Sequence, residues 1–147
     1  MKAWLQRVSK ASVAIDGETV ASIGDGYLIL LGVKDGDTET NADEIAAKIP
    51  VIRLFSDENG KMNLSLKDIG GSVIVVSQFT LYADMNHGRR PGFSAAAKPD
   101  AAEPLYRYFV EKLRTSIGTE KVGTGRFGAD MKVSLVNDGP VSIELTS

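Results

Sequence analysis

The chain has 147 residues, of which 43% are hydrophobic and 24% charged, a composition typical of a globular protein with a hydrophobic core. A net charge of −2 argues against a general nucleic-acid coat protein, and the lack of cysteine excludes disulfides and thiolate chemistry. The longest apolar stretch, Tyr27–Val33, is too short to cross a membrane. We therefore expect one cytoplasmic domain over residues 1–147, with no membrane partner.

Short runs of β-prone residues predict strands along most of the chain. In chain order they are Ala3–Val8, Ser12–Ile15, Thr19–Ile23, Tyr27–Val33, Val51–Phe55, Val73–Phe79, Met131–Val136 and Val141–Leu145. Because Val73–Val76 is continuously apolar, we expect a central strand there. Asp-Gly or Asn-Gly pairs at 16–17, 25–26, 35–36, 59–60 and 138–139 favour tight hairpins.

Two helices are predicted between the strands. The first runs from Thr40 to about Ile49, and Pro50 should end it. The second begins with Asp100 as N-cap and Glu103 three residues later, and Gly118 follows its last turn. Apolar side chains at helical spacing should face the core, namely Ala42, Ile45, Ala46 and Ile49 in the first helix and Leu105, Phe109, Leu113 and Ile117 in the second. Blocks of strands around two helices predict an α+β fold with layered antiparallel or mixed sheets.

Histidine chemistry has little support in this sequence. The chain has one histidine, His87, so a Cys–His pair is excluded and any Ser-His-Asp triad depends on this imidazole. His87 lies between Asn86 and Gly88, which favours a solvent-exposed loop over an oriented base. A catalytic zinc normally needs several His or Cys ligands, so we expect neither a metal nor a cofactor.

Two other patterns imitate ligand-binding motifs without the required context. Gly123–Gly128 has the spacing of a dinucleotide-binding loop, but a polar segment precedes it and a predicted strand follows it. We interpret it as a glycine-rich β turn or bulge. The acidic spacing over residues 35–41 imitates an EF-hand, but Thr40 and Ala46 replace the required Gly and Glu, so a solvated helix entry is the better interpretation.

The densest basic cluster is Arg89-Arg90, flanked by His87 and Lys98. A protein that grips only the end of an RNA needs few phosphate contacts, and such a cluster can supply them. A solvated loop without a partner explains the same residues.

Two short runs carry the strongest functional signal: Ser77-Gln78-Phe79-Thr80-Leu81-Tyr82 closes an apolar strand, and Asn137-Asp138-Gly139-Pro140-Val141-Ser142 lies near the C-terminus. Taken by themselves, the first fits a core strand whose Thr80 caps a turn, and the second fits an ordinary hairpin. Gly next to Pro can also hold the backbone in a shape that few other dipeptides allow.

Together the two runs resemble the signature of the D-aminoacyl-tRNA deacylases. The resemblance continues, in order and spacing, over essentially the full chain, in Gln6–Val8 with Ala11–Val13, Phe55–Asp57 through Gly60–Leu64, Arg90-Pro91 with Phe93-Ser94, and Thr124-Gly125 through Gly128–Met131. This chain has Ser142 where the family usually has Thr, and Gly92 where Ser is more common. Ser142 keeps the hydroxyl, whereas Gly92 loosens the basic loop and bears on tRNA preference.

The resemblance implies an α+β homodimer that hydrolyses the ester of D-aminoacyl-tRNA at the acceptor end, and of glycyl-tRNA as well. It implies an active site at the subunit interface, where the cis Gly139–Pro140 segment of one subunit reaches into the other's pocket and rejects L-amino acids. Ser77, Gln78, Phe79 and Thr80 would bind the aminoacyl-adenosine end and polarise the carbonyl. In the family the terminal 2′-hydroxyl of the tRNA takes part in the chemistry, which suits a chain with no base beside Thr80 in sequence.

Two other classes of protein remain open at this point. A non-catalytic dimeric module that binds an RNA end or a small metabolite would use the same pocket without turnover. A structural assembly domain explains the β-rich pattern but not the paired runs. A deacylation assay that compares D- and L-aminoacyl-tRNA separates all three.

Overall fold

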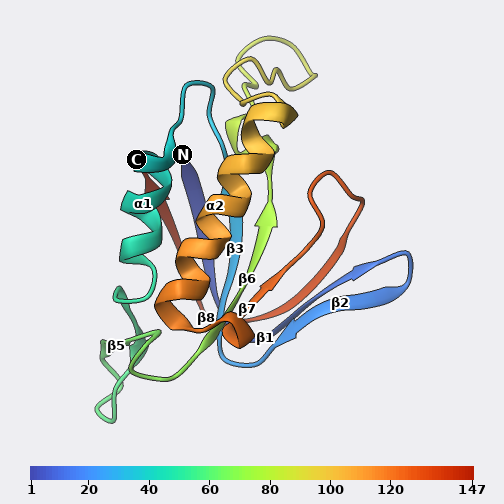
Figure 1. Ribbon diagram of the computed structural model, residues 1–147. Coiled ribbons are helices and arrows are strands. Elements are labelled where there is room, and N and C mark those ends of the chain that lie inside the picture. Colours follow the sequence, from blue (N-terminus) through green and yellow to red (C-terminus); the bar gives the residue numbers. More distant parts are fainter.

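A computed structural model describes all 147 residues and has a mixed six-stranded sheet, a separate β-hairpin and two long helices (Figure 1). The sheet contains β1 (Lys2–Ile15), β2 (Glu18–Ile23), β3 (Gly26–Gly32), β6 (Ser72–Ser77), β7 (Val122–Thr124) and β8 (Lys132–Thr146). The hairpin is β4 (Arg53–Ser56) with β5 (Met62–Ser65), the helices are α1 (Glu39–Lys48) and α2 (Pro99–Ile117), and two 3-10 turns are η1 (Phe79–Tyr82) and η2 (Thr119–Lys121). The expected α+β class is confirmed. No helix is long and apolar enough to span a membrane.

The long strand β1 organises the sheet. Along one edge it pairs antiparallel with β3 through its first half and with β2 through its second half. Its other edge pairs with β8 along almost the whole strand, and β8 has no further partner. Beyond β3, the strands β6 and β7 are added in parallel, so β6 is flanked on both sides. The central position expected for Val73–Val76 is confirmed, and all four side chains are buried.

Alternate residues of the inner strands fill two separate apolar clusters. Tyr27, Ile29 and Leu31 face the helices, where they join the larger cluster with Val73, Val75 and the buried faces of α1 and α2. The intervening residues point to the opposite face and form a smaller cluster with β1, which contains Val8, Ala11, Val13, Leu28, Ile74 and Val76. Figure 1 shows both helices on one side of the sheet.

The sheet curls so that its two outer strands approach each other. A Cβ placed on Gly123 of β7 would lie 3.0 Å from the Cβ of Ala21 in β2. Glycine at position 123 therefore permits a close approach that a larger residue would prevent. The strand β7 was not predicted, because it has only three residues and Val122 is its one apolar side chain. The glycine-rich bulge expected over 123–128 is thus partly strand.

The first helix was predicted to within one residue at each end. It begins after Thr38, whose backbone N–H donates to Asn41 Oδ1 at 2.8 Å, and it ends before Pro50, as expected. The predicted start of α2 was wrong. Lys98 is the N-cap and Pro99 the first helical residue, because the fixed φ of proline suits the first turn.

The buried face of α2 is also shifted from the prediction. Phe109 and Leu113 are buried as expected, whereas Leu105 and Ile117 are only half-buried. The fully buried side chains are Ala102, Tyr106, Phe109, Val110 and Leu113. The predicted stripe follows a strict four-residue step, whereas a helix of 3.6 residues per turn buries a mixture of three- and four-residue steps. Gly118, with φ of 104°, follows the helix as expected.

Two pairs of predicted strands are each one continuous strand. The predictions Ala3–Val8 and Ser12–Ile15 merge into β1, because Ser9 is an extra residue between the pairs Val8–Asn137 and Lys10–Val136. This bulge puts two exposed polar residues in the middle of a strand. The predictions Met131–Val136 and Val141–Leu145 merge in the same way into β8.

Asp-Gly and Asn-Gly pairs predicted hairpins correctly at two of the five positions. The pairs at 16–17 and 59–60 join antiparallel partners, β1 with β2 and β4 with β5. The pair at 25–26 joins strands that both pair with β1, the pair at 35–36 precedes α1, and 138–139 lies inside β8. A glycine with positive φ fits many kinds of tight turn, so an Asp-Gly or Asn-Gly pair predicts a turn. Whether the two flanking segments then pair as a hairpin depends on which other strands they meet. Two other predictions also differ from the structure. The strand β5 was not predicted, and the strand predicted over Val73–Phe79 ends at Ser77.

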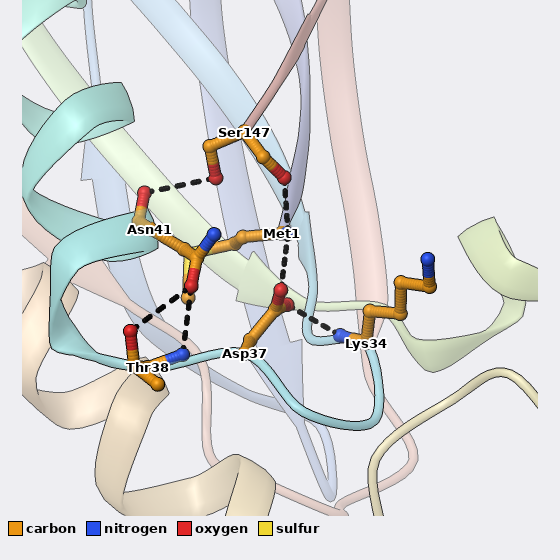
Figure 2. A network of polar contacts seen from close by, with 6 residues as sticks. All are labelled: Met1, Lys34, Asp37, Thr38, Asn41 and Ser147. Carbon is orange, nitrogen blue, oxygen red and sulfur yellow. Dashed lines mark hydrogen bonds and ion pairs between the residues drawn. The ribbon is translucent and has the colours of Figure 1, made fainter.

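The two ends of the chain lie side by side against the loop before α1 (Figure 1). The amino nitrogen of Met1 lies 2.7 Å from Asp37 Oδ1 and 3.1 Å from the carbonyl oxygen of Ser147. Figure 2 shows Asp37 also accepting the backbone N–H of Lys34, at 2.6 Å, while the side chain of Lys34 points away from this network. Ser147 Oγ donates to the carbonyl of Asn41, so the first and last strands are tied to α1.

Candidate active site

A cavity of about 570 Å³ opens where β6 ends and η1 begins. Its walls come from the carboxyl ends of β3 and β6, the start of α2, and the segments around residues 93–99 and 127–133. Thirteen of its 18 lining residues are hydrophobic, and Lys98 is the only charged one. The polar side chains of the lining are Ser77, Gln78 and Lys98. This composition suits a flat organic group held at its edge by a few polar contacts.

Ser77, Gln78 and Phe79, three of the residues that the resemblance assigned to the site, all line this cavity. The N–H of Gln78 donates to the carbonyl of Leu31 at 2.8 Å, which is the last contact between β6 and β3 before the chain turns. A Cβ on Gly32 would lie 3.1 Å from the carbonyl oxygen of Gln78. Glycine at 32 therefore lets the turn pack closely on β3 and present these residues at the end of the strand.

Thr80 lies beside the cavity and not in its wall. Its side chain is exposed, and its Oγ1 accepts a hydrogen bond from Gln78 Nε2. No acidic, basic or imidazole side chain is bonded to this hydroxyl. The hydroxyl of Thr80 is thus bonded to an amide and to no group that could act as its general base.

An aromatic contact ties the cavity to the long segment before α2. Phe79 is 55% exposed, and its ring meets Phe93 edge-on with the centroids 4.8 Å apart. Phe93 and the following residues form one wall of the cavity, since the N–H of Ala97 donates to the carbonyl of Val33. The position of Phe79 thus depends on a segment that comes later in the sequence.

Tyr106 closes the back of the cavity. Its hydroxyl donates to the carbonyl of Val75 at 2.8 Å, and its ring lies 5.9 Å from that of Phe127. Burial raises the pKa of Tyr106 to about 12, so the hydroxyl keeps its proton near neutral pH. Neither aromatic residue had a sequence signal for a cavity, because each fits an ordinary core position equally well.

Gly139 and Pro140 lie elsewhere on the surface and do not line this cavity. Both are exposed, and the peptide bond between them is cis, as the resemblance implied. They belong to a wide bulge in β8: Gln6 pairs with Ser142 and Val8 with Asn137, so residues 138–141 face Arg7 alone. The hairpin interpretation of this run is therefore wrong.

The guanidinium of Arg7 fills the space beneath that bulge. Its Nε donates to the carbonyl of Asp138 at 2.9 Å, and its Nη1 donates to the carbonyl of Leu54 at 2.5 Å. The side chain is 9% exposed, and a Cβ on Gly139 would lie 3.0 Å from its Nη2. Arg7 was not predicted as part of the site, because in the sequence it stands among the polar residues Gln6, Ser9 and Lys10 and gives no sign of burial.

The remaining polar candidates stay at the surface. His87, Arg89 and Arg90 are exposed in the segment between η1 and α2, and their side chains make no hydrogen bonds. No three His, Cys, Asp or Glu side chains lie close enough together to share a metal ion. Of the basic cluster, Lys98 lines the cavity, whereas His87, Arg89 and Arg90 lie in the exposed loop that precedes the cavity wall at Phe93.

Comparison with known proteins identifies the family. Residues 4–146 match the family model described as D-Tyr-tRNA(Tyr) deacylase. A D-aminoacyl-tRNA deacylase of Symbiobacterium thermophilum is 55% identical over 147 residues, covering 100% of this chain and 96% of that protein. One from Aeromonas hydrophila is 56% identical over 146 residues, covering 99% of each.

Two solved structures share the fold of this chain. The structure titled c-Myc DNA Unwinding Element Binding Protein superposes with a TM-score of 0.95 at 42% identity, covering 100% of this chain and 99% of that one. A structure described as a probable eukaryotic D-amino acid tRNA deacylase shares the fold, with a TM-score of 0.81 at 15% identity over 98% of each chain. By its match over nearly the whole length, the chain belongs to the D-Tyr-tRNA(Tyr) deacylase family.

Proposed function

We propose that this protein hydrolyses the ester bond between a D-amino acid and the terminal ribose of tRNA, releasing the free amino acid and the tRNA. Besides the family, the observation that carries this proposal is the cavity at the end of β6, where Ser77, Gln78 and Phe79 surround a space of about 570 Å³. A largely apolar wall with a few polar groups at one edge suits a nucleoside ester. Since aminoacyl-tRNA is the substrate, we propose the cytoplasm as the site of action.

The ester carbonyl is polarised in this proposal by groups of the Ser77–Thr80 turn. Backbone N–H groups at the end of a strand, together with the Ser77 hydroxyl and the Gln78 amide, can stabilise the oxygen of a tetrahedral intermediate. Thr80 orients Gln78 through their hydrogen bond and does not attack the carbonyl. No side chain bonded to Thr80 can act as a general base. In this proposal the neighbouring 2′-hydroxyl of the terminal ribose assists the hydrolysis instead.

Chiral selection is assigned to Gly139 and Pro140 of a second copy of the chain. Both residues are exposed and lie outside the cavity of their own subunit, so they are free to enter another. In this proposal the backbone of Gly139 and Pro140 collides with the side chain of an L-amino acid and so excludes it from the site. A 10⁴-fold discrimination corresponds to about 5.5 kcal/mol, which a steric clash can supply more readily than a single hydrogen bond. Glycine has no side chain to reject, so glycyl-tRNA is also a substrate.

The homodimer that this requires is supported by the free edge of β8. This strand of 15 residues pairs only with β1, and most of its residues are exposed. Long unpaired edges are normally covered or blunted in stable proteins. A second copy that covers β8 would carry Gly139 and Pro140 into contact with another subunit.

The test compares three substrates on the same tRNA: D-aminoacyl, L-aminoacyl and glycyl esters. We expect release of the D-amino acid and of glycine, with the L-ester left intact. Binding of the D-ester without turnover would favour the non-catalytic RNA-end module instead. Absence of both binding and turnover would favour a structural assembly domain.

A further inference from the structure

We propose that Arg89, Arg90 and Lys98 form a phosphate-binding rim that holds the RNA strand leading into the cavity. This inference rests on the proposed function, because it concerns how the same substrate is held. It goes beyond that function by assigning RNA affinity to three side chains that take no part in ester hydrolysis.

The three cations sit on one segment, which also builds the cavity wall. Asp84 and Gly92 exchange two backbone hydrogen bonds of 2.8 Å, so residues 85–91 project as a closed loop that carries Arg89 and Arg90. The chain then enters the wall at Phe93 and reaches Lys98 immediately before α2. Figure 1 shows this segment above the amino-terminal end of α2.

None of the three side chains has a partner within the protein. They take part in none of the ion pairs or hydrogen bonds of the structure, and all three residues are exposed. The nearest acids in sequence, Asp84 and Asp100, form no ion pair with these cations; each accepts a backbone N–H within its own turn, from Asn86 and Ala101 respectively. In a chain of net charge −2, this leaves an unneutralised group of cations beside the cavity.

The chemistry of the substrate explains what these cations bind. A terminal nucleoside that occupies the mostly apolar cavity must leave its 5′ phosphate at the mouth, and each preceding nucleotide adds another phosphate outside. Lys98 is the one charged residue of the lining, which suits the first phosphate as a point-charge contact. The guanidinium groups of Arg89 and Arg90 can each bind a phosphate through two N–H donors.

The binding test uses an uncharged, fluorescein-labelled RNA minihelix that ends in CCA, and measures its affinity by fluorescence anisotropy across a salt series. The variants are Lys98→Gln and the double substitution Arg89→Gln with Arg90→Gln. Lys61→Gln is the matched control, because Lys61 is exposed in the turn between β4 and β5, outside the cavity. We expect each lost contact to reduce the slope of log affinity against log salt by about 0.7, while the control keeps the wild-type slope.

The kinetic test compares D-aminoacyl-tRNA with D-aminoacyl-adenosine, an ester that has no phosphate. We expect the variants to raise KM for the tRNA substrate several-fold, and to lose much less activity on the adenosine ester. Slopes and KM values equal to those of the wild type would overturn the inference, as would equal losses on both substrates. A wild-type protein that hydrolyses neither ester would instead refute the proposed function, and the RNA-binding slopes would still decide on the rim.

Discussion

The guanidinium of Arg7 lies beneath the β8 bulge, with its Nε 2.9 Å from the carbonyl oxygen of Asp138. The same side chain donates to the carbonyl of Leu54 within β4, so one buried cation links β1, β8 and the β4–β5 hairpin. Residues 138–141 have no backbone pairing partner on β1, and it is the Arg7 side chain that bonds to this segment, at Asp138. The shape of the Gly139–Pro140 segment therefore depends on a residue more than 130 positions earlier.

Replacing Arg7 tests this dependence. Arg7→Met leaves two carbonyl oxygens without their charged donor, and we expect a loss of about 2–4 kcal/mol in the free energy of unfolding by urea denaturation. Arg53→Met is the control, because Arg53 is exposed and its Nη1 lies 3.4 Å from Asn63 Oδ1. The control should change stability by less than about 0.5 kcal/mol. Equal stabilities for the two variants would show that Arg7 does not hold the bulge.

Thr80 distinguishes a protein nucleophile from assistance by the substrate. Thr80→Ala should retain substantial deacylase activity, because its hydroxyl has only the Gln78 amide as a partner. A tRNA that ends in 2′-deoxyadenosine should react far more slowly with the wild-type protein. Single-turnover rates measure both effects. An inactive Thr80→Ala protein, with equal rates on the ribose and deoxyribose ends, would instead identify Thr80 as the nucleophile.

The buried phenol of Tyr106 leads us to expect a smaller free energy of unfolding at alkaline pH. Burial raises its pKa to about 12 from 10.0, so the folded state keeps the phenol neutral where the unfolded chain ionises. Its contribution to stability is complete below pH 10 and is lost as the pH rises towards 12. Tyr106→Phe should cost about 1 kcal/mol at pH 8, by removing the bond to Val75, and about nothing relative to wild type at pH 11.

Tyr108→Phe provides the control for this pH dependence. The hydroxyl of Tyr108 lies 3.2 Å from both carboxylate oxygens of Asp43 and is only partly buried. Denaturation midpoints of wild type and both variants between pH 8 and pH 11 measure the effect. If the difference in denaturation midpoint between Tyr106→Phe and wild type stays constant over this range, ionisation of the Tyr106 phenol does not lower the stability in alkali as we infer.

Oligomeric state gives a fourth prediction. We expect light scattering to give twice the chain mass of 15.7 kDa, because the proposed site uses Gly139 and Pro140 of a second subunit and β8 has a free edge that this subunit can cover. Dilution below the dimer dissociation constant should abolish activity in parallel with the fall in mass. A fully active monomer would contradict the shared site.

Local patterns in the sequence were sufficient for most of the secondary structure. The spacing of Ala42, Ile45 and Ala46 predicted α1 nearly to its ends, and the continuous apolar run Val73–Val76 predicted a strand buried on both faces. Both signals depend on short-range periodicity, which reports directly which face of an element is buried. The two signature runs likewise identified the family before any contact was known.

Only the tertiary structure decided where the site residues lie relative to one another. The sequence placed Ser77, Gln78 and Phe79 together because they are adjacent, but it could not show that Phe93, Tyr106 and Phe127 complete their cavity. It read residues 137–139 as a hairpin turn, since Asn-Asp-Gly fits one, whereas pairing with β1 continues on both sides of them. Pairing, bulges and cavity walls arise from contacts between distant segments, and no local propensity encodes which distant segment a strand will meet.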